Sequence, residues 1–206
     1  MKVYFLRILE LFFPSTQDEK IIADMTEVGM ISLYVQIYQS GNISLSHFSD
    51  QRIRALVHLN KFHSNANVQK LLAVLLSKYI QTLPPTEYVL IPIPLSKQRE
   101  RTRGYNQVTR IAQQAMPYSR DACVHLRTDI LMRTIHTPPQ TSLTKSERLL
   151  NLSGAFTVVS GKEAIISGKN IILLDDVTTT GTTLHEAKAT LLPHGPASII
   201  CVAIAR

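Results

Sequence analysis

The fold is decided by residues 170–205, which read NIILLDDVTTTGTTLHEAKATLLPHGPASIICVAIA. Two apolar runs, residues 170–176 and 198–205, are typical of strands buried on both faces. Residues 184–192 between them have helical spacing, and Pro193 and Gly195 end that helix. A strand, a helix and a second strand in this order predict a right-handed parallel crossover. The sequence therefore predicts an α/β fold with helices on both faces of a mainly parallel sheet.

The segments upstream continue this pattern. Apolar residues recur at helical spacing over residues 68–79, and Pro84 and Pro85 require that helix to end before them. YVLIPIPL, residues 88–95, predicts another short buried strand. A helix follows from about Asn106 and closes at Pro117. Residues 122–126 are a weaker strand candidate.

Residues 1–50 are predicted to form a separate N-terminal appendage, and residues 51–206 the main domain. The appendage begins with an amphipathic stretch, residues 1–13, which we expect to pack on the protein's own core rather than on a membrane surface. The alternating residues 31–37 predict a strand, and Ser40-Gly41-Asn42 predicts a turn.

Composition narrows the class of protein. The 206 residues carry a formal net charge of +7, and 45% of them are hydrophobic, as in an ordinary globular protein. No apolar run reaches the roughly 18–20 residues of a membrane span. Only two cysteines occur, Cys123 and Cys201, so we expect neither a disulfide framework nor a four-cysteine zinc site, and we predict a cytoplasmic protein.

The motif with the clearest chemistry follows the strand predicted over residues 170–176. Asp175 and Asp176 offer hard oxygen atoms that suit ribose hydroxyls or a hydrated magnesium ion. Residues 178–183, here called the threonine loop, supply hydroxyls, a glycine and the free amides of a helix start, which together favour an anion. Ligands of parallel sheets bind at the carboxyl ends of strands. A sugar phosphate would satisfy both parts.

Other phosphate motifs are absent from the sequence. It contains neither GxxxxGK[ST] nor GxGxxG, so a P-loop and a dinucleotide fingerprint are excluded. In the alternative interpretation, the threonine loop is an ordinary turn with a helix cap, and the two aspartates are solvated. The order of apolar strand, acidic pair, Thr/Gly run and helix favours the ligand site.

Residues 171–184, IILLDDVTTTGTTL, resemble the phosphoribosyl diphosphate (PRPP) signature of type I phosphoribosyltransferases. The resemblance implies a three-layer α/β/α fold. It also implies that Asp175 and Asp176 contact the ribose, with Mg²⁺ nearby and held in part through water. The 5′-phosphate would lie on the threonine loop, whose residues are Thr178, Thr179, Thr180, Gly181, Thr182 and Thr183.

Further blocks narrow the resemblance to the ComF family of competence-associated, phosphoribosyltransferase-like proteins. These blocks are residues 54–65, 91–107, 131–156 and the closing CVAIAR, and the similarity covers about residues 52–206. Members commonly begin with a cysteine zinc ribbon, whereas this sequence has no cysteine before Cys123. A DNA contact made through such a ribbon is therefore not expected here.

Positive charge is concentrated in the middle of the chain, where residues 95–150 hold ten basic and four acidic side chains. Four cations alternate directly after the strand predicted over residues 88–95. In an extended loop they would face one way and clamp the pyrophosphate of PRPP, although a solvated loop or a nucleic-acid contact is an alternative. These residues are Lys97, Arg99, Arg101 and Arg103.

Residues 131–148 resemble the flexible hood that closes over PRPP in this family and excludes water. The resemblance makes Arg133, Gln140 and Arg148 the groups expected to approach the substrate, and Arg133 and Arg148 the candidate catalytic residues. Thr144 and Glu147 also fit a capping box, so for Arg148 a structural role is an equal alternative.

The resemblance implies a magnesium-dependent transfer of the phosphoribosyl group from PRPP to a nucleophile. The sequence leaves the acceptor open among nucleobases, ammonia and non-nucleotide compounds, and it leaves the oligomeric state open. A second hypothesis is a non-enzymatic protein of DNA uptake that keeps the fold as a ligand sensor or scaffold. A PRPP-responsive DNA regulator is a weaker third hypothesis, because residues 1–50 show no helix-turn-helix pattern.

Overall fold

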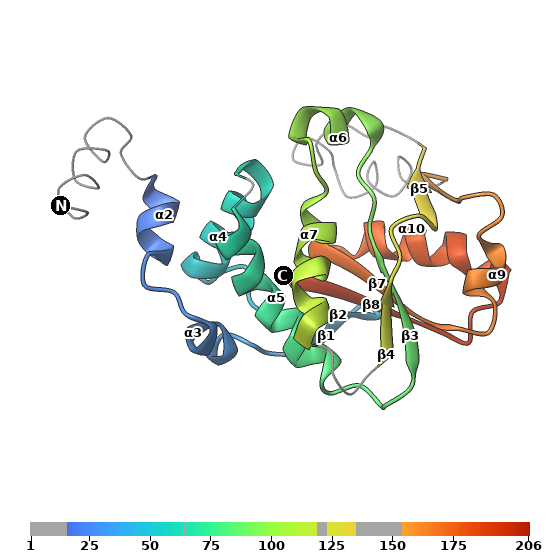
Figure 1. The fold of residues 1–206 in the computed structure, drawn as a ribbon, viewed down its shortest axis with the longest axis horizontal. Helices are drawn as coiled ribbons and strands as arrows, with labels where there is room; N and C mark the ends of the chain where they lie inside the picture. The colour runs from blue at the N-terminus through green and yellow to red at the C-terminus, as the bar shows by residue number, and fades with distance from the viewer. Residues whose placement is uncertain (1–15, 64, 119–122, 135–153) are drawn as a thin grey trace.

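The structure, a computed structural model, describes residues 16–63, 65–118, 123–134 and 154–206. A six-stranded sheet forms its centre (Figure 1), with the spatial order β1-β2-β8-β7-β3-β4. In that order its strands are β1 (Ile37–Gln39), β2 (Asn42–Ser44), β8 (Ser198–Ala205), β7 (Asn170–Val177), β3 (Glu87–Pro92) and β4 (Cys123–Leu126).

Every strand pair in this sheet except β1–β2 is parallel. The predicted crossover is confirmed, because β7 and β8 lie side by side and α10 (Thr182–Leu191) connects them. The strand predicted over residues 88–95 is confirmed as β3, which ends at Pro92, although the Ile93 amide still donates a hydrogen bond to Leu174 of β7. The weaker candidate is confirmed as the edge strand β4.

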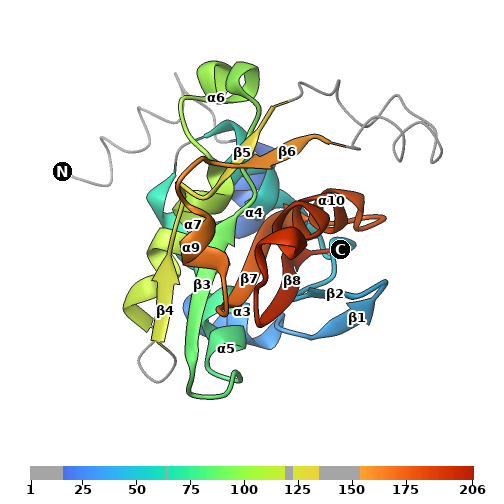
Figure 2. The ribbon, with the colours of Figure 1, turned by 90° about the vertical axis from the view of Figure 1, so that its right-hand side faces the viewer.

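Helices cover both faces of the sheet (Figures 1 and 2). Ile172 and Leu174 of β7 belong to one apolar core, with α4 (Gln51–Phe62), α5 (Ala66–Ile80) and α7 (Gln107–Ala115). Ile171 and Leu173 belong to the other, with α10 and α9 (Glu163–Ile166). Successive side chains of a strand point to opposite faces, so a strand that is apolar throughout requires a layer on each side. The three-layer α/β/α prediction is confirmed.

The predicted helices over residues 68–79 and from Asn106 are confirmed as α5 and α7. Asn65 caps α5, and Asn106 caps α7 by accepting hydrogen bonds from the amides of Val108 and Thr109. A smaller antiparallel pair, β5 (Leu131–Arg133) and β6 (Phe156–Val158), lies above α10 and near α6 (Lys97–Arg103) (Figure 2).

The N-terminal region differs from its prediction. Two short helices, α2 (Gln17–Ile22) and α3 (Glu27–Ser32), precede β1. The strand predicted over residues 31–37 is therefore wrong except at Ile37, where β1 begins. Thr26 caps α3 through the Gly29 amide, and the helix buries Met30 against the core, which outweighs the alternating pattern.

The turn at Ser40-Gly41-Asn42 is confirmed. Ser40 and Gly41 both have positive φ, and they join β1 to β2. Since β2 pairs with β8, residues 37–44 belong to the same sheet as the C-terminal strands. The amphipathic stretch 1–13 lies outside the described residues. Across the described ranges, no helix has the length and apolar character needed to cross a membrane.

Candidate functional site

A cavity of about 480 Å³ lies where the carboxyl ends of β3 and β7 meet the end of α4, and we call it the central cavity. Apolar residues of the connection after β3 form part of its wall, and Thr183 lines it from the first turn of α10. Its charged lining consists of two carboxylates and four cations, namely Asp175, Asp176, Lys61, Arg99, Arg103 and Arg133.

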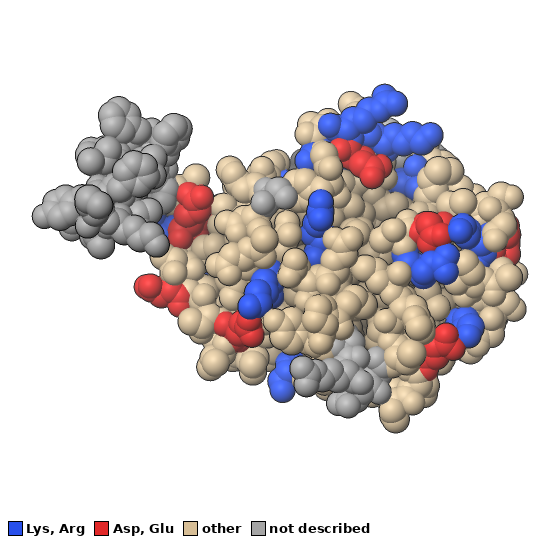
Figure 3. Space-filling view, viewed as in Figure 1, with Lys and Arg blue, Asp and Glu red and all other residues tan. Residues whose placement is uncertain are grey.

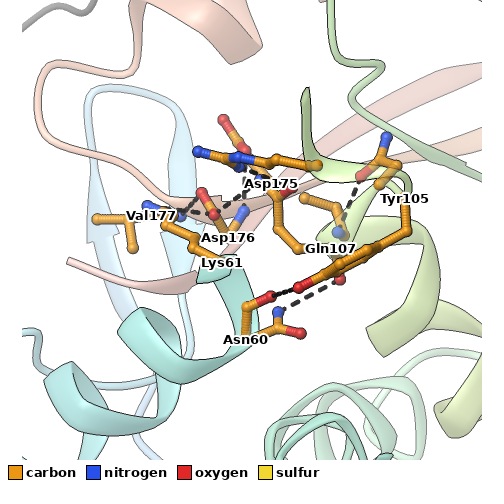
Figure 4. Close-up of polar contacts among 10 residues, drawn as sticks. Asn60, Lys61, Tyr105, Gln107, Asp175, Asp176 and Val177 are labelled. Atoms are coloured by element: carbon orange, nitrogen blue, oxygen red, sulfur yellow. Dashed lines mark hydrogen bonds and ion pairs between the residues drawn. The ribbon is translucent and has the colours of Figure 1, made fainter. Parts of the chain in front are cut away.

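Asp176 is held by three groups that come from different parts of the chain (Figure 4). Its Oδ1 accepts a hydrogen bond of 2.7 Å from the Val177 amide. Its Oδ2 accepts one of 3.1 Å from Nε2 of Gln107 and lies 3.2 Å from Nζ of Lys61. The side chain is only 9% exposed, so these partners stabilise its charge in a place where water cannot.

Asp175 has a different environment. Its Oδ1 accepts a hydrogen bond of 2.8 Å from the Asp176 amide. Burial, followed by the neighbouring charge of Asp176, raises the pKa of Asp175, while the same amide, Lys61 and Arg133 act in the opposite direction. The two acids of the motif are therefore not equivalent, because Asp176 is locked in an ion pair and Asp175 retains a proton more readily.

The cations of the cavity are also partly buried. Burial lowers the pKa of the Arg99 and Arg133 guanidiniums, and a positive neighbour of each acts in the same direction, whereas the carboxylates raise it. Among the described residues, four cations and two acids line the cavity, so this part of its lining carries an excess of positive charge. Such an arrangement favours a ligand that brings several negative charges.

The prediction of an extended loop over residues 97–103 is wrong, because these residues form the helix α6. Ser96 caps it by accepting a hydrogen bond from the Arg99 amide, and Gly104 ends it with a φ of 74°. In a helix, residues four apart share a face and residues two apart do not. Arg99 and Arg103 therefore face the central cavity.

The other two cations of α6 turn away from the central cavity. Lys97 lines a second cavity of about 500 Å³ on the far side of the connection after β3, and Arg101 is exposed and lines neither cavity. Figure 3 shows Lys and Arg side chains gathered over α6 at the top of the molecule. Of the four cations predicted to bind the pyrophosphate together, only Arg99 and Arg103 therefore line the same cavity as the carboxylates.

The threonine loop connects β7 to α10. The Thr178 amide donates to the carbonyl oxygen of Ala205, and the hydroxyls of Thr180 and Thr182 are 2.7 Å apart. Gly181 has a φ of 81° and precedes the first residue of α10. Within the described ranges, no acceptor is present for the amides of Thr179, Thr180 and Gly181. The first turn of a helix adds further unpaired amides, so the loop is equipped to bind an anion.

Arg133 reaches the cavity from β5. It is only 7% exposed, its guanidinium carbon lies 5.4 Å from the ring centre of Phe156, and a bridge to Ser96 ties β5 to the start of α6. Arg133 thus lines the same cavity as the two carboxylates. Gln140 and Arg148 lie outside the described residues.

Three residues beside the carboxylates are not among the candidate site residues predicted from the sequence. Lys61, in the last turn of α4, forms an ion pair with Asp176. Gln107 had no predicted role, yet its Oε1 accepts a hydrogen bond of 3.0 Å from Arg103 while its Nε2 donates to Asp176. The Tyr105 hydroxyl donates to the Asn60 carbonyl at 2.8 Å and joins α4 to the segment before α7 (Figure 4).

The chain has relatives among known proteins. Residues 58–206 match the phosphoribosyl transferase domain family. The competence protein ComFC of Bacillus subtilis is 36% identical over 131 residues, which are 60% of this chain. Competence protein F of Haemophilus influenzae is 31% identical over 156 residues, which are 73% of this chain. The chain belongs to the ComF family of phosphoribosyltransferase-like proteins.

The aligned residues make up 46% of the Bacillus protein and 66% of the Haemophilus protein. This chain therefore spans about half to two thirds of the length of these relatives. Among solved structures, a hypoxanthine phosphoribosyltransferase of Staphylococcus aureus is 16% identical, with a TM-score of 0.37. That similarity covers 67% of this chain and 60% of the other.

The residues of this ComF-family protein fit a divalent cation only in part. Both oxygens of Asp176 already accept hydrogen bonds, and one also faces Lys61. In the described ranges, no three His, Cys, Asp or Glu side chains are grouped closely enough to hold a metal ion. A metal here would therefore take most of its ligands from a substrate and from water, with Asp175 as the nearest protein carboxylate.

Proposed function

We propose that this ComF-family protein binds PRPP and transfers its phosphoribosyl group to a nucleophilic acceptor, releasing pyrophosphate. The observation that carries this proposal is the shared central cavity. It is lined by the carboxylate pair, by two arginines of α6 and by Thr183 at the start of α10. PRPP has hydroxyls in its middle and phosphates at both ends, and these three kinds of group suit them.

In this proposal, the carboxylate pair accepts hydrogen bonds from the ribose hydroxyls. Lys61 and Gln107 hold Asp176 in place, so only Asp175 has to adjust when the ribose enters. The free amides of the threonine loop bind the 5′-phosphate. Arg99, Arg103 and Arg133 neutralise the pyrophosphate, which is the leaving group.

The reaction is a displacement at C1 of the ribose. The lone pair of the acceptor forms the new bond to C1, and the bond from C1 to the pyrophosphate oxygen breaks with its electron pair leaving on the pyrophosphate. Positive charge develops on the ribose and negative charge on the leaving group. Carboxylates beside the first and guanidiniums beside the second lower the barrier by positioning and charge stabilisation.

Magnesium is part of the proposal as an ion that arrives with PRPP. When bound, it would supply positive charge to the pyrophosphate oxygens. The chain's own part is to present Asp175, with water, to that ion, because Asp176 is already committed to Lys61 and Gln107. The hood role of residues 131–148, including Gln140 and Arg148, and the catalytic role of Arg133 also remain proposals.

A second candidate function rests on the names of the relatives. Both the Bacillus and the Haemophilus relatives are competence proteins, and a 30% identical protein of Escherichia coli strain K12 is called a DNA utilization protein. In this alternative, the protein assists DNA uptake and the PRPP site senses a ligand without turnover. The exposed cations Lys97 and Arg101 would then be free to meet a polyanion.

Pyrophosphate release separates the two candidates. The protein is incubated with PRPP, Mg²⁺ and one of a panel of nucleobases, ammonia or other amines. Acceptor-dependent release that is lost in Asp175→Asn/Asp176→Asn supports the enzyme. PRPP binding without release for any acceptor supports the sensor, and no PRPP binding overturns both.

A matched pair of variants tests the assignment of α6. Arg99→Gln should raise the KM for PRPP about tenfold, because it removes a charged contact to the pyrophosphate. Arg101→Gln makes the same change on the solvent side of the helix and should leave KM unchanged. Equal effects of the two variants would contradict the proposed place of the pyrophosphate.

A further inference from the structure

The threonine loop rests on a buried amide that comes from the N-terminal hairpin. Asn42, the first residue of β2, lies opposite Cys201 of β8 and is only 2% exposed. A Cβ atom placed on Gly181 would lie 2.1 Å from Nδ2 of Asn42. The side chain of Asn42 therefore packs directly against the backbone of Gly181, and only a glycine leaves room for it.

Neither polar atom of this side chain is satisfied. Across the described ranges, Nδ2 and Oδ1 of Asn42 have no hydrogen-bond partner, and both atoms are shielded from water. A buried amide without partners is costly, and an apolar residue of the same shape would avoid that cost. Such a group calls for an explanation, of which a functional role is one.

The hairpin contacts the start of α10 at a second point. Nε2 of His185, in the first turn of α10, donates a hydrogen bond of 2.6 Å to the carbonyl oxygen of Ser40. Pairing of β2 with β8 holds the hairpin in the sheet. The hairpin therefore contacts the start of α10 at two points, through Asn42 and through Ser40.

We propose that Asn42 is a positioning residue of the phosphate site, whose Nδ2 gains a hydrogen-bond acceptor when the threonine loop holds a phosphate monoester. The amides of Thr179, Thr180 and Gly181 have no acceptor among the described residues, so an anion would draw them toward itself. The N–H and C=O of one peptide unit point in opposite directions. Turning an N–H toward the anion therefore turns a carbonyl of the loop toward the opposite side.

Asn42 lines no part of the central cavity, whereas Thr183 does. In this proposal its amide therefore meets the loop from behind rather than the ligand itself. Binding of the phosphate and formation of a hydrogen bond from Nδ2 of Asn42 to the loop would then be coupled. This inference rests on the proposed function, since it takes the threonine loop as the site of the 5′-phosphate.

The test uses Asn42→Leu, with Asn42→Val as a second variant suited to a strand. Ribose 5-phosphate probes the threonine loop, and inorganic pyrophosphate with Mg²⁺ probes the arginines of α6. We expect both variants to melt at or above the temperature of the wild type in the absence of ligand. Their affinity for ribose 5-phosphate should fall about tenfold, while their affinity for pyrophosphate stays unchanged.

Retained pyrophosphate binding shows that a variant is folded, and a purely structural role of Asn42 would not separate the two ligands. Wild-type affinity for ribose 5-phosphate in the variants would overturn the inference alone. A parallel loss for both ligands would also overturn it. If the wild type itself binds neither ribose 5-phosphate nor PRPP, the proposed function fails and this inference fails with it.

Discussion

Gln107 offers the sharpest perturbation of the carboxylate pair. Its amide lies between opposite charges, with Nε2 donating to Asp176 at 3.1 Å and Oε1 accepting from Arg103 at 3.0 Å, and the residue is 4% exposed. In Gln107→Glu, an ionised carboxylate replaces the donor and faces Asp176. Losing a hydrogen bond to a charged group costs about 1.5–3 kcal/mol, so PRPP affinity should fall roughly ten- to hundredfold at pH 8.

The pH dependence of Gln107→Glu is the decisive part. Lys61 and Arg103 favour the ionised form of the new carboxyl, whereas burial, Asp175 and Asp176 favour the protonated form. Once protonated, the new carboxyl presents one donor and one acceptor, as the amide of Gln107 does. The ratio of variant to wild-type affinity should therefore recover as the pH falls from 8 to 6.

Calorimetric titration with PRPP at both pH values measures this ratio. Gln107→Met removes both hydrogen bonds without adding a titratable group, so its loss of affinity should not depend on pH. Gln113→Glu places the same charge on an exposed position of α7 and should have no effect. Wild-type affinity of Gln107→Glu at pH 8, or a loss that does not recover at pH 6, would refute the reasoning.

Three further predictions concern neighbouring groups. Gly181→Ala should lower the free energy of unfolding by about 2–4 kcal/mol, because the new Cβ atom would clash with Asn42. Gly168→Ala, where φ is also positive but the space is open, should lower it by only about 1 kcal/mol. Denaturant titration measures both values, and equal losses of stability would contradict the clash. The pKa of Asp175 is raised in the folded state, so ionised Asp175 destabilises the fold once the pH exceeds the ordinary pKa of an aspartate. Asp175→Asn should therefore be about 1–2 kcal/mol more stable than the wild type at pH 8 and equal to it at pH 3, as judged by urea unfolding, and a less stable variant at pH 8 would reverse the assigned sign. Lys61→Met, which breaks the ion pair with Asp176, should weaken PRPP binding about tenfold. Lys70→Met, which breaks an exposed ion pair with Glu27, should leave PRPP binding unchanged. Equal effects of the two variants in a calorimetric titration would show that Lys61 does not support the site.

The parts of the fold that the sequence predicts are those encoded by short, local patterns. The strand over residues 170–176 has its own apolar run, and the helix predicted over residues 184–192 has helical spacing and ends at Pro193 and Gly195, so the crossover could be predicted without tertiary information. The position of the carboxylate pair follows in turn, because a parallel strand delivers its last residues to the ligand edge of the sheet.

The failures have a common physical cause. Residues 97–103 alternate in charge, which looks extended, but Ser96 and Gly104 provide the caps of a helix, and these short-range signals decided the structure. For residues 27–32, burial of Met30 and the Thr26 cap had the same effect. Local caps and burial therefore outweighed a period of two in both segments.

The site residues that escaped prediction depend on contacts between distant segments. Gln107 meets Asp176 across 69 positions of sequence, and Lys61 reaches the same carboxylate from still farther away along the chain. No local sequence pattern predicts such a contact, because each of these residues is an ordinary polar residue in the first or last turn of a helix. Lys61 and Gln107 both lie in blocks that resemble the ComF family, residues 54–65 and 91–107, and this resemblance was the signal that could have directed attention to them.

Titration of the wild-type protein with PRPP in the presence of Mg²⁺, repeated with Asp175→Asn/Asp176→Asn, tests the central claim most directly. The account predicts saturable binding of one PRPP per chain in the wild type and loss of that binding in a double variant whose folding is verified by its cooperative thermal unfolding. The absence of PRPP binding to the wild type, or undiminished binding to the folded double variant, would contradict it.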